Sequence, residues 1–68
     1  MKLSLAEARR LRNKTQADMG NILGITAQTY RKLELNPGLI RMRDAKIISD
    51  YLKIPLEDLQ FIKNDDAK

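Results

Sequence analysis

The stretch between residues 15 and 34 places apolar side chains at helical spacing, but two glycines interrupt the pattern. Apolar residues that recur three and four positions apart form one face of a helix. Gly20 lies inside the first half of the stretch, and Gly24 divides the two halves. Because glycine in a helix interior costs about 1 kcal/mol relative to alanine, two short helices are expected here rather than one. The apolar positions are Met19, Ile22, Leu23, Ile25, Tyr30 and Leu33.

Helix start and stop signals predict short helices and no strand. Ser4 and Glu7 have the form of a capping box, and Asn13 can end this first helix in a left-handed conformation. A second helix is expected from an N-cap at Thr15 to about Leu23. No segment alternates apolar and polar residues with the period of two that a strand requires. The predicted fold is therefore all-α.

The remaining signals place three further helices, which makes five. Gly24 can stop the second helix with a positive φ, and a third helix is expected over residues 26–34. Pro-Gly at residues 37–38 predicts a tight turn, followed by a fourth helix over residues 42–52 and a fifth over residues 56–62. The fourth helix is expected to turn Met42, Ala45, Ile48 (or Ile47) and Leu52 toward the core.

Length and composition exclude several classes of protein. The 68 residues correspond to one domain, expected over residues 1–62, with a polar and disordered tail at residues 63–68. Cysteine and histidine are absent, which excludes disulfides, thiolate zinc sites and His-based catalysis. No run approaches the roughly 18 apolar residues of a membrane span, and the N-terminus lacks the apolar core of a signal peptide. We therefore expect a cytoplasmic protein that is not an enzyme and that needs no cofactor and no metal ion.

The net charge of +4 is unevenly distributed along the chain. Residues 1–43 carry nine basic and three acidic side chains, a net charge of +6, whereas residues 44–68 carry four basic and six acidic ones, a net charge of −2. One half can therefore approach a polyanion while the other half faces away from it. A generally soluble basic surface explains the same numbers equally well, so charge alone leaves nucleic-acid binding open.

The two glycines of the interrupted stretch fit a helix-turn-helix unit. In this unit a turn of three or four residues containing glycine joins two short helices, and Gly24 would make that turn. Gly20 is expected on the inner face of the second helix, where the third helix crosses closely. A side chain larger than alanine would then hold the two helices apart. A simple helical bundle would favour alanine at both positions.

The sequence TQADMGNILGITAQTYRKLE resembles the Cro- and repressor-type (XRE-like) helix-turn-helix of phage and bacterial regulators. The resemblance extends from residue 4 to about residue 60. It implies a compact five-helix domain, similar to lambda repressor, with the helix-turn-helix at the second and third helices. The positions that fall on the family's pattern are Thr15, Gln16, Met19, Gly20, Leu23, Gly24, Ile25, Thr26, Thr29, Tyr30, Leu33 and Glu34.

Three features depart from the family's pattern. Lys14 stands where an apolar residue usually precedes the second helix. Asn36 replaces a common glycine after the third helix, but asparagine tolerates left-handed φ, so the turn is expected to survive. The loop NPGLI at residues 36–40 replaces a more basic one.

The resemblance makes residues 26–34 a recognition helix for the major groove of DNA, with Ala27, Gln28 and Lys32 facing the bases. Gln28 can pair with adenine N6 and N7, Lys32 can donate to guanine O6 and N7, and Ala27 can pack on a thymine methyl. Arg31 is a further candidate, for a base or a phosphate. The alternative for these four side chains is an ordinary solvated helix face.

Contacts to the DNA backbone are expected on both sides of the recognition helix. Gln16 and Thr26 stand at helix N-termini, where N–H groups and the helix dipole favour phosphate. Arg41 and Arg43 either bind phosphates or only solubilise the start of the fourth helix. The full set of predicted backbone contacts is Gln16, Thr26, Thr29, Asn36, Arg41 and Arg43.

Two further residues are given a structural role by the resemblance. Arg9 and Glu34 match a largely buried ion pair that fixes the angle of the recognition helix without touching DNA. Arg10 and Arg12 are expected to be solvated by their helical spacing. Tyr30 occupies a core position, where its hydroxyl needs a partner or must reach the surface.

The resemblance also implies a homodimer, because one unit covers only a few base pairs and family members usually bind two-fold operators with half-sites roughly 34 Å apart. Phe61 and Ile62 are the candidate dimer residues, and pairing only on DNA is an alternative. We expect a Cro-like repressor, nucleoid-associated in a bacterial cell or a phage-infected host, with no membrane partner and no small-molecule ligand. The competing hypothesis is a small interaction protein, an anti-repressor or antitoxin, that binds another regulator with the same fold.

Overall fold

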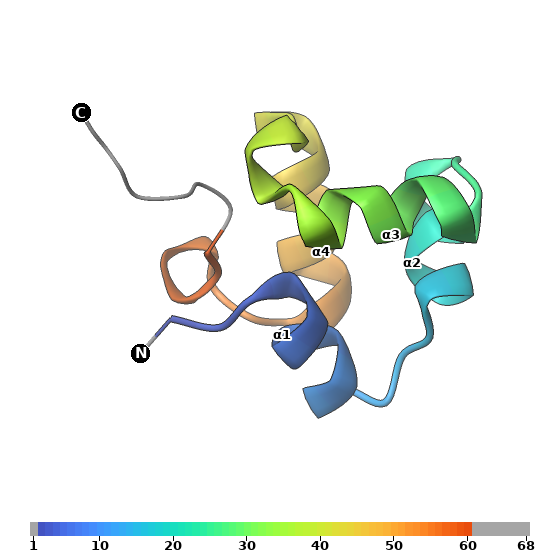
Figure 1. The fold of residues 1–68 in the computed structure, drawn as a ribbon. Coiled ribbons are helices and arrows are strands. Elements are labelled where there is room, and N and C mark those ends of the chain that lie inside the picture. Colours follow the sequence, from blue (N-terminus) through green and yellow to red (C-terminus); the bar gives the residue numbers. More distant parts are fainter. Residues whose placement is uncertain (1, 61–68) are drawn as a thin grey trace.

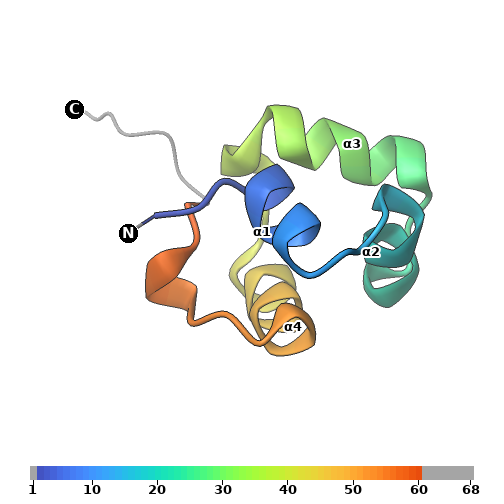
Figure 2. The same ribbon diagram turned by 90° about the horizontal axis from the view of Figure 1, so that it is seen from below.

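The computed structural model describes residues 2–60 and contains four α-helices within them (Figure 1). No strand occurs in this part of the chain, so the all-α prediction is confirmed there. Figure 2 shows α3 along one side of the molecule and α4 on the opposite side, with α1 between them in this view. The elements are α1 (Leu5–Leu11), α2 (Gln16–Leu23), α3 (Ala27–Leu35), the 3-10 turn η1 (Pro37–Leu39), α4 (Met42–Leu52) and the 3-10 turn η2 (Leu56–Asp58).

The helices begin where the sequence places their caps. The Ser4 hydroxyl accepts from the N–H of Glu7, and the Glu7 carboxylate accepts from the N–H of Ser4, which completes a capping box at α1. Thr15 and Asp18 form the same reciprocal pair at α2. Asn13 has a φ of 58°, the left-handed conformation predicted for the end of the first helix.

The prediction of a fifth helix over residues 56–62 is wrong for the described residues. Only the three-residue turn η2 forms there, and the chain becomes extended at Leu59. Leu3 N–H donates to the carbonyl of Asp58 over 2.8 Å, and Gln60 N–H donates to the carbonyl of Leu3, also over 2.8 Å. This isolated parallel bridge between Leu3 and Leu59 uses the backbone groups that a continuing helix would need.

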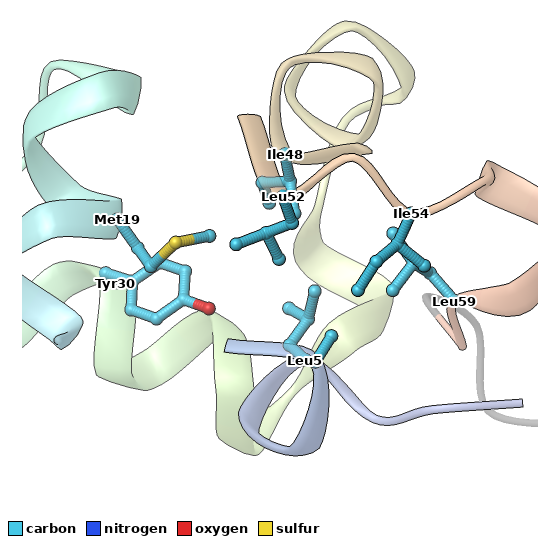
Figure 3. Close-up of a cluster of buried hydrophobic side chains, with 8 residues drawn as sticks. Leu5, Met19, Tyr30, Ile48, Leu52, Ile54 and Leu59 are labelled. Carbon is cyan, nitrogen blue, oxygen red and sulfur yellow. The ribbon is translucent and has the colours of Figure 1, made fainter. Parts of the chain in front are cut away.

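One apolar core joins all four helices (Figure 3). On α4, Ala45, Ile48 and Leu52 are buried as predicted, and Ile48 rather than Ile47 faces the core. Met42 is 68% exposed, so its predicted inward position is wrong, because it is the first residue of α4 and lies beyond the edge of the core. The core cluster is formed by Leu5, Ala8, Met19, Tyr30, Ile48, Leu52, Ile54 and Leu59.

Candidate nucleic-acid interface

The turn between α2 and α3 depends on Gly24. This residue has φ 73° and ψ 27°, a left-handed conformation that favours glycine. The N–H of the next residue, Ile25, donates to the carbonyl of Gly20 over 2.9 Å, a hydrogen bond that caps the C-terminal end of α2. Thr26 then caps α3, because its hydroxyl accepts from the N–H of Thr29 over 3.1 Å. The three residues 24–26 thus connect two helices in a fixed orientation.

Gly20 lies against the backbone of this turn. A Cβ atom at Gly20 would lie 2.7 Å from the carbonyl oxygen of Ile25 and 3.0 Å from the carbonyl carbon and oxygen of Thr26. The close approach is tighter than the sequence indicates, since even the methyl group of alanine would force backbone atoms to move. The atoms that Gly20 approaches belong to the backbone of the turn, at Ile25 and Thr26, and not to the third helix as the sequence analysis expected.

The surface of α3 divides into a core side and an exposed side. Tyr30 is fully buried, and Leu33 and Glu34 are half-buried. Gln28, Arg31, Lys32 and Leu35 are exposed and recur at positions i, i+3, i+4 and i+7, so they share one face of the helix. Ala27 is half-buried beside this face. The structure therefore brings three of the four predicted base-contacting residues together on one open stripe, with Ala27 at its margin.

The comparison with protein families identifies this arrangement. A model of the helix-turn-helix family matches residues 5–59. The chain belongs to the helix-turn-helix family. It is similar to the cryptic phage CTXphi transcriptional repressor RstR of Vibrio cholerae serotype O1 (strain ATCC 39315 / El Tor Inaba N16961), with 39% identity over 59 residues. This similarity covers 87% of the chain and 53% of RstR, so the chain spans about half the length of this relative. No solved structure matches the chain.

The predicted phosphate contacts of this helix-turn-helix chain are exposed, with one exception. Thr26, Thr29, Asn36, Arg41 and Arg43 are open to solvent. Gln16 is half-buried instead, and its side-chain Nε2 donates to Glu34 Oε1 over 3.1 Å. This contact is missing from the sequence prediction, because it joins the start of α2 to the last turn of α3 and has no signature in local spacing.

Asn36 ends α3 differently from the expectation. Its φ is −133° and its ψ is 75°, so it does not use the left-handed conformation predicted for it. Pro37 follows directly, and the proline ring disfavours helical geometry at the residue before it. Asn36 therefore lies in the short irregular segment around η1, whereas Arg41 is the N-cap of α4 and Arg43 lies in the first turn of that helix.

The expected ion pair between Arg9 and Glu34 is present. Arg9 Nε donates to Glu34 Oε2 over 2.7 Å, and the two side chains are only 12% and 8% exposed. Burial alone would raise the pKa of the Glu34 carboxyl, but hydrogen bonds from Arg9 and Gln16 outweigh it and hold that pKa below its usual value. Arg9 also donates through Nη1 to the carbonyl of Lys14 over 3.0 Å. One side chain of α1 therefore fixes both α3 and the loop before α2.

The Tyr30 hydroxyl neither reaches the surface nor meets a hydrogen-bond partner among the described residues. Figure 3 shows it directed into the core cluster, on the side where Leu5 lies. Burial raises the pKa of Tyr30, and the negative charge of Glu34 raises it further. The helix-turn-helix thus carries an unpaired buried polar group beside its ion pair.

Two further basic side chains make contacts within the domain. Arg12 is exposed as predicted, but its Nε donates to the carbonyl of Leu52 over 2.7 Å at the C-terminal end of α4, where cations are favoured. Lys14 Nζ lies 5.1 Å from the centre of the Tyr51 ring, within the range of a cation–π interaction. Both contacts join residues far apart in the chain, which explains why the sequence did not indicate them.

The remaining predictions about the site concern absences and the dimer residues. Within residues 2–60, no group of acidic side chains has an arrangement that could hold a metal ion. No helix in the same range is both long and apolar enough to cross a membrane. Phe61 and Ile62, the predicted dimer residues, lie outside the described residues.

Proposed function

We propose that this chain is a sequence-specific, double-stranded DNA-binding transcriptional regulator of the Cro-like repressor type. The observation that carries the proposal is the exposed stripe of Gln28, Arg31 and Lys32 on α3. Amide and cationic donors on an open helix are the side chains that read base edges in the major groove. Membership of the helix-turn-helix family and the similarity to the repressor RstR support the same function.

The helix α3 enters the major groove with its N-terminal half toward the bases. Gln28 pairs with an adenine, Lys32 or Arg31 with a guanine, and Ala27 packs against a thymine methyl. Gly20 and Gly24 set the direction of α3 relative to α2, and the ion pair of Arg9 with Glu34 holds its other end. The DNA-binding domain comprises residues 1–62.

Contacts to phosphates fix the register of the complex. Thr26 is the N-cap of α3, while Arg41 and Arg43 place cations at the N-terminal end of α4. Arg31, Lys32, Arg41 and Arg43 take part in no ion pair within residues 2–60, so all four cations are available to an anion. The operator is a palindrome that binds two copies of the chain, one at each half-site.

Selection from random duplex DNA at fixed salt tests this function. Repeated capture by the full chain should enrich a palindrome whose half-sites are spaced by roughly one helical turn, 34 Å. No enrichment over bulk DNA would overturn sequence-specific binding. Enrichment of a single half-site without a palindrome would overturn the two-copy operator alone, and the absence of any DNA preference would favour the interaction-protein hypothesis.

A further inference from the structure

Two hydroxyl groups meet in the first turn of α3. Thr26 Oγ1 accepts from the N–H of Thr29 over 3.1 Å and donates to Thr29 Oγ1 over 3.0 Å. The single proton of the Thr26 hydroxyl is therefore used within the chain and cannot be given to an acceptor outside it. The Thr29 hydroxyl accepts this bond and keeps its own proton. Because a hydroxyl that accepts one hydrogen bond is polarised into a stronger donor, Thr29 is the threonine that can donate outward.

Thr29 lies on one flank of the exposed stripe of α3 that begins with Gln28. It is itself exposed, and as the residue after Gln28 it points about 100° around the helix from that side chain. The residue on the other side of Gln28 is Ala27, which is half-buried and apolar. In the first turn of α3, a hydroxyl donor is therefore exposed on one flank of the stripe and not on the other.

The width of the major groove decides what this flank meets under the proposed function. An α-helix with its side chains measures about 10–12 Å across, and the major groove of B-DNA is about 12 Å wide. A helix that turns its stripe toward the bases therefore turns its flanks toward the two sugar-phosphate backbones. A side chain as short as threonine can reach a backbone that lies so close. Its free proton suits a phosphate oxygen, which is an acceptor only.

The charge at the third position of α3 agrees with such a contact. Glu7 in α1 and Asp18 in α2 occupy the same position, and each carboxylate accepts from the backbone N–H of its cap residue. Thr29 is neutral, so α3 lacks this half of the capping box. A carboxylate on this flank would repel phosphate, whereas a hydroxyl can bind it.

We propose that Thr29 contacts the DNA backbone, its hydroxyl donating to a phosphate oxygen at the side of the major groove, and that the hydroxyl of Thr26 holds it in place for this bond. The contact rests on the proposed function and gives the two threonines different roles, since Thr26 positions and Thr29 binds. It is independent of base sequence, because every nucleotide carries the same phosphate. It is also uncharged, so it fixes the distance of α3 from the backbone without releasing counterions.

Binding of the full chain to the selected operator and to a scrambled duplex, each at several salt concentrations, tests the contact. Thr29→Val keeps the shape of the side chain and the N–H that bonds to Thr26, but it removes the hydroxyl. Binding to both duplexes should weaken by about 10- to 100-fold per bound copy, the loss of one hydrogen bond to a charged group. The slope of log affinity against log salt should stay the same. The matched control is Thr29→Ser, which keeps the hydroxyl and should bind nearly as well as the wild type.

Thr29→Glu separates DNA binding from stability. The new carboxylate can accept from the N–H of Thr26 and complete a capping box like that of Ser4 with Glu7. The midpoint of urea denaturation should therefore rise or stay the same, while binding to both duplexes should fall further than in Thr29→Val. Thr29→Gln is the control, because it can form the same box without the charge and should bind DNA more tightly than Thr29→Glu.

Four results would overturn the contact and leave base reading by α3 intact. They are wild-type affinity in Thr29→Val, equal losses in Thr29→Val and Thr29→Ser, a loss on the operator but not on the scrambled duplex, and equal affinities of Thr29→Glu and Thr29→Gln. A wild-type chain that prefers no duplex would instead overturn the proposed function, and the contact with it.

Discussion

Gln16 Nε2 lies 3.1 Å from Glu34 Oε1, so the side chain of the first residue of α2 donates a hydrogen bond to the last turn of α3. A glutamine amide carries two N–H donors, and Glu34 takes one of them. Under the proposed function, the second would donate to a phosphate of bound DNA. Gln16 would then connect the position of the DNA backbone directly to the orientation of α3.

Gln16→Met keeps the length of this side chain and removes its amide. The free energy of unfolding should fall by about 1–3 kcal/mol, because the lost hydrogen bond goes to a charged, half-buried carboxylate. Urea denaturation measures the change. The matched control is Gln28→Met, which alters an exposed side chain and should change stability by less than about 0.5 kcal/mol. Equal effects of the two variants would contradict a structural role for Gln16.

Acid should destabilise the protein through Glu34, because the folded-state pKa of this carboxyl lies below its ordinary value of 4.5. Such a carboxyl stabilises the fold above its unfolded-state pKa, and the contribution is lost as the pH falls through the lower folded-state value. The free energy of unfolding, measured by urea titration at a series of pH values, should therefore decline below pH 4.5. Glu34→Gln should be less stable at neutral pH and decline less steeply.

Asp18 provides the comparison for this acid profile. Its pKa is also lowered, by hydrogen bonds from the backbone and side chain of Thr15, so it contributes to the same decline. Asp18→Asn should remove only that share, and the double variant with Glu34→Gln should give the flattest profile. A profile that Glu34→Gln leaves unchanged would contradict the assignment of the ion pair.

Gly20→Ala should lower the free energy of unfolding by about 1–3 kcal/mol, because the new Cβ would lie 2.7 Å from the carbonyl oxygen of Ile25. Thermal and urea denaturation measure the loss. Gly38→Ala is the control, since a Cβ there meets nothing within 4 Å, and it should be neutral or slightly stabilising. A stabilising effect of Gly20→Ala would show that the turn adapts at little cost.

Tyr30→Phe should leave the free energy of unfolding unchanged or raise it by up to about 1 kcal/mol. The buried hydroxyl has no partner among the described residues, so its removal abolishes a desolvation cost and keeps the ring in place. The raised pKa of Tyr30 also means that wild-type stability is lost as the pH rises above the ordinary value of 10.0, and the variant should lack this loss. A destabilised variant would indicate that the hydroxyl does find a partner.

Gln28→Ala and Arg41→Ala should weaken DNA binding in different ways. Gln28→Ala should cost about 1–3 kcal/mol at one operator position and leave the salt dependence unchanged, because the lost side chain is neutral. Arg41→Ala should weaken all duplexes alike and reduce the slope of log affinity against log salt by about one. Titrations of the selected operator and a scrambled duplex at several salt concentrations separate the two patterns. If Arg41→Ala weakened binding at one operator position and Gln28→Ala weakened all duplexes alike, the result would contradict base reading by Gln28 and phosphate binding by Arg41.

The sequence predicts most of the fold here because most of its determinants are local. The caps at Ser4, Thr15 and Thr26 and the left-handed Gly24 each depend on residues within a few positions, and each forms as expected. Likewise, the exposed stripe of α3 follows from helical spacing once Tyr30 is assigned to the core.

The predictions that failed depend on contacts between distant residues. The chain forms a bridge to Leu3 where the fifth helix was predicted. Met42 was predicted to face inward, but it is exposed because the core ends before the first residue of α4. The bonds of Gln16 to Glu34 and of Arg12 to Leu52 exist only after the helices have packed. Local periodicity carries no information about these partners.

The bridge between Leu3 and Leu59 also has a consequence for the order of folding. It joins the two ends of the described chain, so its formation closes a loop that contains all four helices, at a large cost in chain entropy. The helix-turn-helix needs only neighbouring residues and can form first. The bridge should therefore be the last contact to form and the first to open, and the amides of Leu3 and Gln60 should exchange with solvent before those of α2 and α3.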